Sequence, residues 1–329
     1  MSCFSSTCDE KLPVAKSLAE AGKLEEALEL LSGLEKQTRT GCDTHSTARV
    51  LVTIVQLCYN AGDFTQLNDR IQDLVKKRSQ LKQAVAKMIA ECCTFLDNIK
   101  DKPTMLKLID TLRTVTAGKI YVENERARLT HRLAKIHEKD DNVAEAAKIM
   151  QELQVETYGS MERTEKVELI LEQMRLCLVT KDFIRTQIIS KKISTRFFED
   201  AKHSELKLKF YRYMIELGQH EGDYLEICRN FRQVYDTPCI QEDADQKVDT
   251  LKNIVLYIVL SKFDNEQSDL IHRWDDSIVC LQYSLLTLVS ESRQTRSWMT
   301  FQFIRVSWRS SSPTSSSARP TSASSMRQS

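Results

Sequence analysis

The stretch YNAGDFTQLNDRIQDL, residues 59–74, decides the fold, because it joins a polar turn to a helix with one apolar side. The apolar residues after the turn fall at offsets 0, 3, 7 and 10, namely Phe64, Leu67, Ile71 and Leu74. On an α-helix these offsets trace a single stripe. The stretch therefore predicts an amphipathic helix that begins directly after Gly62 and Asp63.

The same turn and stripe recur about every forty residues, which is the spacing of a helical repeat. Full copies of the stripe begin at five positions: Leu24, Phe64, Met105, Val143 and Tyr224. A weaker copy begins at Phe183, where the polar residues Thr186, Gln187 and Ser190 occupy three of the apolar slots. The repeated unit is thus longer than the stripe itself.

A second helical run lies between successive stripes and completes the unit. These runs cover residues 46–58, 83–96, 119–137, 166–178 and 206–217. Each unit is a helical hairpin, and stacked hairpins bury the stripes that a single hairpin leaves open. We predict an all-α fold, an irregular right-handed α-solenoid of about six hairpins, with a seventh cut short near residues 261–269. It is similar to tetratricopeptide repeats, but its period is longer and their Trp/Tyr pattern is missing.

The charge balance gives no reason to expect nucleic acid or an anionic membrane as a partner. The 329 residues carry 47 Lys and Arg against 46 Asp and Glu, a formal net charge of +1. The most apolar stretches, residues 251–260 and 277–289, are too short to span a bilayer. The N-terminus lacks the basic and apolar regions of a signal peptide. The ten cysteines are therefore expected to stay reduced, in the cytoplasm and nucleus.

The sequence contains no pattern that predicts catalysis. The motifs HExxH, GxSxG, GxxxxGK[ST] and GxGxxG are all missing. His131 and His137 lie six positions apart, which is not the spacing of a metal pair on a helix. We expect no enzyme activity, no catalytic residue, no cofactor and no metal. A Cys/His nucleophile stays open, because such partners meet only in the fold.

The densest basic run, KKRSQLKQAVAK at residues 76–87, allows three interpretations. It could be a nuclear-import signal or a patch for an acidic partner. Acidic residues flank it on both sides, which favours a solvated start of a helix.

Several segments resemble one known family, that of the non-ATPase regulatory subunit 12 of the 26S proteasome. They include LIDTLRTVTAGKIYVENERARLT at residues 108–130 and KDFIRTQIISKKI at residues 181–193. The others lie at residues 34–40, 77–88, 153–161, 235–241 and 263–270. The resemblance extends from about residue 13 to about residue 273.

This resemblance implies an α-solenoid that serves as a non-catalytic scaffold in the lid of the regulatory particle. The implied partners are other lid subunits, the deubiquitinase subunit and the ATPase ring, in a hetero-oligomer without nucleic acid or membrane. The implied role is to support ATP-dependent degradation of ubiquitinated proteins. Related complexes built from the same PCI family, the signalosome and translation initiation complexes, are the alternative.

The sequence departs from that family after Arg273. All three Trp lie beyond this point, and we find neither the helix pair and hairpin of a winged helix nor the rest of a PCI module. We expect four regions: a flexible N-terminus at 1–12, the solenoid at 13–273, an atypical and partly helical segment at 274–309, and a disordered Ser/Arg-rich tail at 310–329. A variant unable to assemble is therefore a further interpretation.

Overall fold

A computed structural model describes residues 4–273, and every regular element within them is a helix. The all-α prediction is therefore confirmed for this part of the chain. The chain divides into two compact units, residues 1–197 and 198–329, which we describe separately. The expectations for residues 274–309 and 310–329 lie outside the described residues.

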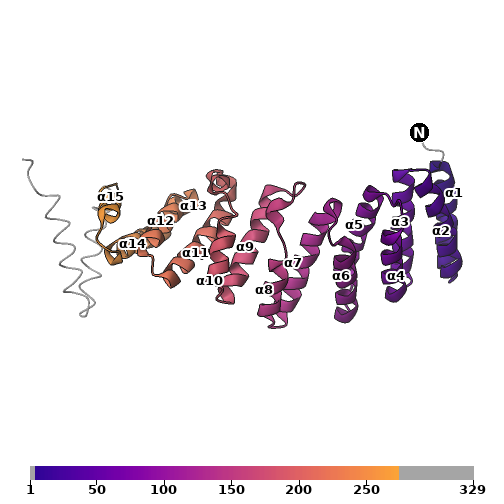
Figure 1. Ribbon diagram of the computed structural model, residues 1–329, viewed down its shortest axis with the longest axis horizontal. Helices are drawn as coiled ribbons and strands as arrows, with labels where there is room; N and C mark the ends of the chain where they lie inside the picture. The colour runs from indigo at the N-terminus through magenta and orange to yellow at the C-terminus, as the bar shows by residue number, and fades with distance from the viewer. Residues whose placement is uncertain (1–3, 274–329) are drawn as a thin grey trace, which may run out of the picture. The chain divides into compact units, whose positions relative to one another are not determined.

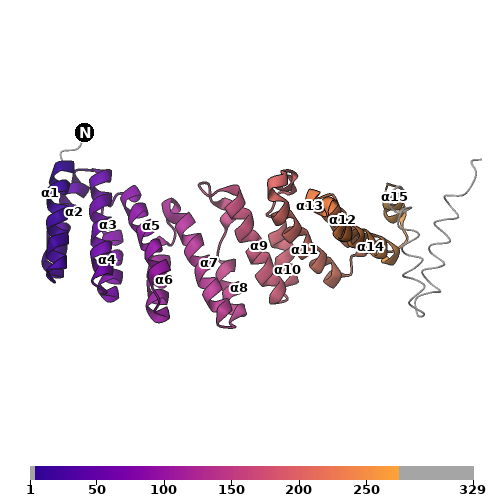
Figure 2. The same cartoon turned by 180° about the vertical axis from the view of Figure 1, so that it is seen from behind.

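Unit 1 contains five helical hairpins that follow one another in chain order (Figure 1). The hairpins are α1 (Ser5–Glu20) with α2 (Leu24–Thr40), α3 (Thr44–Asn60) with α4 (Phe64–Lys76), α5 (Lys82–Asn98) with α6 (Lys102–Thr116), α7 (Glu123–Lys139) with α8 (Val143–Gln151), and α9 (Arg163–Val179) with α10 (Phe183–Ser190). Figure 2 shows the same neighbours from behind. Short 3-10 helices follow α6 (η1, Ile120–Val122) and α8 (η2, Val155–Thr157). The predicted helical repeat is confirmed.

The starts of the predicted stripes coincide with helix starts. Leu24, Phe64, Val143 and Phe183 are the first residues of α2, α4, α8 and α10. Only Met105 is displaced, because α6 begins at Lys102, with Asp101 as its N-cap and Pro103 in its first turn. Proline is favoured there because its missing N–H has no partner in the first turn.

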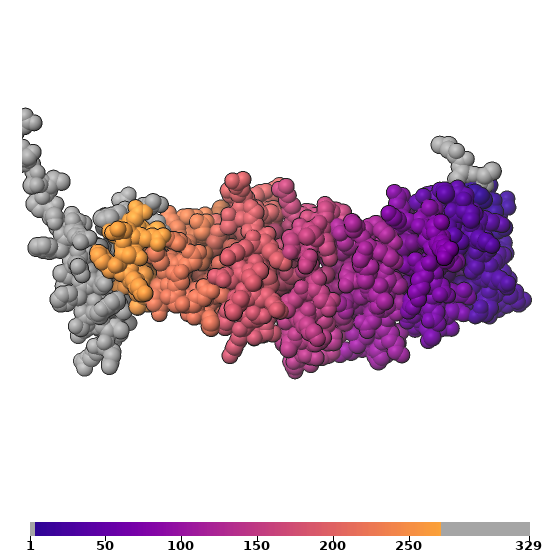
Figure 3. All heavy atoms as spheres, viewed as in Figure 1, coloured from indigo at the N-terminus to yellow at the C-terminus, as the bar shows by residue number. Residues whose placement is uncertain are grey.

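The two helices of a hairpin occupy different places in the stack. We call the first helix of each hairpin the leading helix and the second the trailing helix. The leading helix α3 packs against α1, α2, α4 and α5, whereas the trailing helix α4 packs against α3 and α6. Accordingly α3 buries residues on several sides, while α4 buries one stripe of Leu67, Ile71 and Leu74. The space-filling view shows side chains closing the gaps between these helices (Figure 3).

The N-terminal boundary differs from the expected one. Residues 5–12, expected to be flexible, form the first half of α1. Cys8 and Leu12 are buried in the same core cluster as α3. Pro13 lies inside α1 and removes one backbone donor. Burial of Cys8 and Leu12 against the next hairpin outweighs that loss.

Unit 2 continues the hairpin pattern with shorter and less regular elements. After the 3-10 helices η3 (Thr195–Glu199) and η4 (Ala201–His203) come α11 (Ser204–Glu221), α12 (Tyr224–Tyr235), α13 (Pro238–Glu242), α14 (Ala244–Leu260) and α15 (Asn265–Arg273). The α12 helix packs against both α11 and α14. The buried Gln267 on α15 donates a hydrogen bond to the carbonyl of Ile258 at 2.7 Å, which closes the end of α14. This α14–α15 pair is the short seventh hairpin.

A recurring turn sets where the trailing helices begin. Gly62 adopts φ +73° directly before Asp63, whose carboxylate accepts the backbone N–H of Gln66 at 2.9 Å. The same arrangement of a left-handed residue and an acidic cap precedes α12 and α10, at Gly222–Asp223 and Lys181–Asp182. The cap satisfies one of the four free N–H groups of each helix.

Ion pairs at the period of the repeat join the first hairpin of unit 1 to the second, the third to the fourth and the fourth to the fifth, whereas a hydrogen bond of 2.7 Å from Gln56 to Glu91 links the second to the third. The partners of these ion pairs lie 35 to 42 residues apart in the sequence. The pairs are Asp9–Arg49, Glu35–Lys77, Asp97–Arg132, Lys102–Asp140, Arg113–Glu152, Arg128–Glu165, Glu138–Arg175 and Glu156–Lys192. Exposed pairs of this kind contribute at most about 1 kcal/mol each. Their main effect is to fix how one hairpin aligns with the next.

We expect Lys181→Gly to stabilise unit 1, because Lys181 is exposed and holds a left-handed φ of 59° that strains any residue with a side chain. The gain is about 1 kcal/mol, the cost of that conformation in an L-residue. Urea unfolding of the whole chain followed by circular dichroism measures it. Lys181→Ala is the control, since it removes the charge and keeps the strain. Equal stability of the two variants would contradict this account of the turn.

We also expect the link between α7 and α9 to weaken in acid. Arg128 donates hydrogen bonds of 2.7 and 2.9 Å to Glu165 and lowers the pKa of that carboxylate. A pKa lowered by folding gives stability above the unfolded value, and that stability is lost as the pH falls through the folded value. The midpoint of thermal unfolding should therefore drop more for the natural chain than for Arg128→Gln between about pH 5 and pH 3. Parallel curves for the two proteins would refute the link.

Candidate functional site

The described residues 4–273 contain no cluster of three or more His, Cys, Asp or Glu side chains arranged for a metal. His131 on α7 is half-buried, and burial lowers the pKa of its imidazole. No catalytic, cofactor or metal residue was expected, so none has to be placed.

Most thiols in the described region are poor nucleophiles because they are buried. Burial raises the pKa of Cys58 to about 11 and that of Cys228 to about 12, and it raises the pKa of Cys92 as well. Only the thiolate form attacks electrophiles, so these groups are inert at neutral pH. Cys42 and Cys239 are the exposed cysteines among the described ones.

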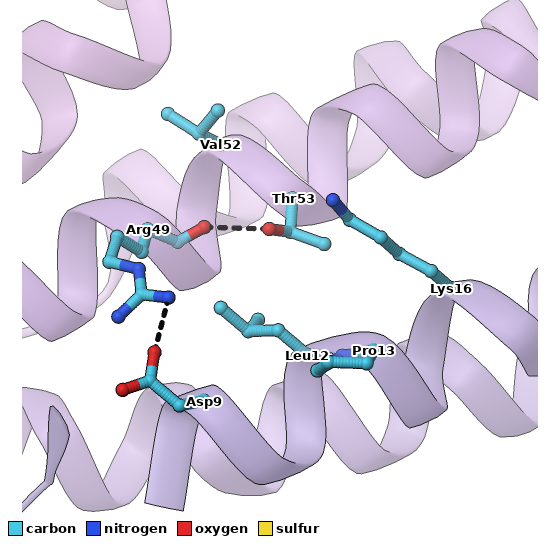
Figure 4. Close-up of a pocket in the computed structure, with 7 residues that line it drawn as sticks. All are labelled: Asp9, Leu12, Pro13, Lys16, Arg49, Val52 and Thr53. Carbon is cyan, nitrogen blue, oxygen red and sulfur yellow. Dashed lines mark hydrogen bonds and ion pairs between the residues drawn. The ribbon is translucent and has the colours of Figure 1, made fainter. Parts of the chain in front are cut away.

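A groove runs between the leading helices α1 and α3. One part holds about 590 Å³ and is lined by Asp9, Leu12, Pro13, Lys16, Arg49, Val52 and Thr53. Figure 4 shows the first four on one helix and the others on its neighbour, with the Asp9–Arg49 ion pair of 2.6 Å between them. A second part of about 300 Å³ lies farther along the same helices and shares Lys16. The groove is lined by apolar side chains and by charged side chains of both signs. Such a lining is suited to binding the side chains of a protein partner rather than to catalysing a reaction.

The trailing helix α10 buries Ile189 and turns two other isoleucines outward. Ile184 is 77% exposed and Ile188, one turn later, is 57% exposed. The buried slots hold Thr186, whose hydroxyl donates a hydrogen bond to the carbonyl of Asp182 at 2.9 Å, and Ser190. The polar residues that weakened the stripe at Phe183 were thus the signal of an outward apolar pair. The weak stripe was visible in the sequence, but the exposed isoleucines were not predicted from it.

The first part of the basic run at 76–87 is structural. The carboxylate of Glu35 on α2 is fully buried and meets the Lys77 amino group at 2.9 Å and the Arg39 guanidinium at 2.9 Å. The Gln80 amide donates to the same carboxylate at 3.1 Å. The link between α4 and α5 is thereby fixed to the first hairpin. Lys82 and Lys87 on α5 are exposed, which agrees with the solvated helix start that the flanking charges favoured.

Among the described residues, the helices are all too short or too polar to cross a lipid bilayer. Residues 4–273 present exposed helix surfaces and the groove between α1 and α3, and they contain no cluster arranged for a metal.

Comparison with known proteins identifies the relatives of this hairpin array. Residues 26–243 match the family described as PSMD12/CSN4, N-terminal. The chain is 44% identical over 270 residues to the 26S proteasome non-ATPase regulatory subunit 12 of Dictyostelium discoideum, covering 82% of this chain and 60% of the relative. It is 42% identical over 278 residues to the Arabidopsis thaliana homolog A of that subunit, covering 78% of this chain and 63% of the relative.

A yeast protein shows the same extent of similarity. The chain is 38% identical over 272 residues to the 26S proteasome regulatory subunit RPN5 of Saccharomyces cerevisiae, covering 82% of this chain and 61% of the relative. The chain thus spans about 60% of the length of the curated relatives that it matches.

We expect alkylation to separate the described cysteines into two classes. With iodoacetamide at neutral pH, Cys42 and Cys239 should react at least about tenfold faster than Cys58, Cys92 and Cys228, because only the first two are exposed. Mass spectrometry of peptides after short labelling times gives each rate. Labelling in urea is the control and should remove the difference. A fast reaction at a buried thiol of the folded chain would revive the nucleophile hypothesis.

Proposed function

Since this chain belongs to the PSMD12/CSN4 N-terminal family, we propose that it acts as a non-catalytic scaffold subunit of the proteasome regulatory particle, in its lid. The observation that carries this proposal is the extent of the match, which covers the hairpins from α2 to α12. The curated relatives are named as regulatory subunits of the 26S proteasome. In this role the chain supports ATP-dependent degradation of ubiquitinated proteins through protein contacts.

The proposed partners are neighbouring regulatory subunits, together with the deubiquitinase subunit and the ATPase ring, in a hetero-oligomer of the cytoplasm and nucleus. Helical repeats bind partners over extended surfaces rather than in enclosed pockets. The outward Ile184 and Ile188 on α10 supply an apolar contact of the kind that partner subunits cover. The groove between α1 and α3 supplies a second contact region at the other end of unit 1.

A second candidate is a subunit of a related complex, because the matched family also includes CSN4. The named relatives with 38% to 44% identity are proteasome subunits, which favours the first candidate.

The proposal is tested by expressing the tagged chain in cells and separating native complexes by gel. We expect it to migrate with regulatory subunits and peptidase activity. Replacing both isoleucines, Ile184→Asp and Ile188→Asp, should reduce this co-migration at least about tenfold, the effect of losing a buried apolar anchor. Gln187→Asp on the same helix is the matched control and should have no effect.

Three other outcomes would decide against the proposal or against this surface. A folded chain that migrates alone supports the variant unable to assemble. Migration with CSN4 supports the related complex. Full co-migration of the double variant leaves the scaffold role standing and removes α10 from the interface.

A further inference from the structure

The short link between α4 and α5 carries a serine directly after a basic run. Lys76 is the last residue of α4, and Lys77 and Arg78 lead to Ser79, which is exposed. Ser79 holds a left-handed φ of 57°, so the backbone turns there instead of continuing the helix. No acidic residue occurs between positions 73 and 91. The serine therefore lies on an exposed turn, behind three consecutive positive charges.

A serine in this charge pattern is the acceptor that one class of protein kinase selects. Kinases distinguish their substrates by the charges around the acceptor residue. A kinase with an acidic peptide site attracts basic residues on the N-terminal side of the serine. Turns between helices lie on the surface, where an enzyme reaches them. The link has the features of a substrate for a basic-directed serine kinase that uses ATP.

The same link holds a buried carboxylate. Lys77 and Gln80, on either side of the turn, reach Glu35 of α2 at 2.9 and 3.1 Å, and Arg39 binds it at 2.9 Å from its own helix. Arg39 also donates a hydrogen bond of 2.7 Å to the carbonyl of Arg78. Glu35 is fully buried, so its negative charge depends on these partners. We call this set of contacts the Glu35 clasp.

A phosphate group on Ser79 competes with Glu35 for Lys77. The serine and the lysine are two positions apart, so their Cα atoms lie within about 7.6 Å, which a lysine side chain spans. Phosphoserine carries a charge of about −1.5 to −2 at neutral pH, more than a carboxylate. The side chain of Lys77 is 32% exposed and is free to turn toward solvent, whereas Glu35 is enclosed. Glu35 then loses one of its two cationic partners.

We propose that Ser79 is a phosphorylation site for a basic-directed serine kinase and that its phosphate opens the Glu35 clasp. The serine oxygen bonds to the γ-phosphorus of ATP as the bond from that phosphorus to the β,γ-bridging oxygen breaks. ADP leaves with the bridging oxygen, and a carboxylate of the kinase takes the hydroxyl proton. The phosphate then draws Lys77 away, which loosens the α4–α5 link from the first hairpin. This role does not depend on any complex that the chain joins.

Phosphorylation of the purified full-length chain tests the site. The catalytic subunit of cyclic-AMP-dependent protein kinase, a basic-directed serine kinase, is supplied with magnesium and ATP, and mass spectrometry of peptides locates each phosphate. We expect phosphate on Ser79 of the folded chain. Lys76→Gln should slow this reaction at least about threefold, because the kinase loses one charge contact. Ser194, which has lysines at positions 191 and 192 before it, is the internal reference, and phosphate on Ser194 with none on Ser79 would overturn the proposal.

Hydrogen exchange tests the opening of the clasp. Amides of residues 77–85 should exchange at least about threefold faster in the phosphorylated chain, because the link loses a contact that protects it. Phosphatase treatment should restore the original rate. Amides of α9, followed in the same samples, report whether the rest of unit 1 stays folded.

Two matched variants, each phosphorylated to completion, identify the group that the phosphate displaces. In Lys77→Gln the phosphate has no lysine to draw from Glu35, so it should change the exchange no further. Lys76→Gln removes the same charge outside the clasp and should keep the full acceleration. Equal acceleration in both variants, or none in the natural chain, would refute the opening of the clasp.

Discussion

Each described hairpin needs a neighbouring hairpin to bury its apolar surface. The two helices of one hairpin cover only the apolar residues that face each other. The stripe of Leu67, Ile71 and Leu74 on α4 is buried only because α3 and α6 lie against it. Hydrophobic burial of this kind is the dominant favourable term in folding. Burial of the stripes already requires the helices to stack. The turn residues, helix caps and ion pairs then set where each helix begins and how neighbouring hairpins align.

The sequence predicted the trailing helices well because each is amphipathic and follows a capped turn. Leu24, Phe64, Val143 and Tyr224 proved to be helix starts because the stripe and the cap are local signals. Leading helices are buried on several sides, so their sequences alternate less clearly between apolar and polar residues and their boundaries are harder to predict. The first half of α1 was missed because the contacts that hold Cys8 come from a distant segment.

The candidate interaction surface was harder to predict than the fold, because it depends on exceptions to the pattern. Thr186 and Ser190 looked like a weak repeat and turned out to mark a helix with isoleucines on its outer side. The buried Glu35 could not be recognised from its neighbours, since Lys77 and Gln80 reach it from the next hairpin. Charge spacing near the repeat period was visible in principle, but which charges meet is decided by packing.

The charged contacts of unit 1 differ in how strongly dissolved salt weakens them. The first junction is fastened by a carboxylate that is fully buried, where dissolved ions cannot shield it. Farther along, the Arg128–Glu165 bridge lies in contact with solvent, with the arginine side chain 59% exposed, and salt weakens it. Raising the ionic strength therefore weakens the Arg128–Glu165 contact before it weakens the contacts of Glu35.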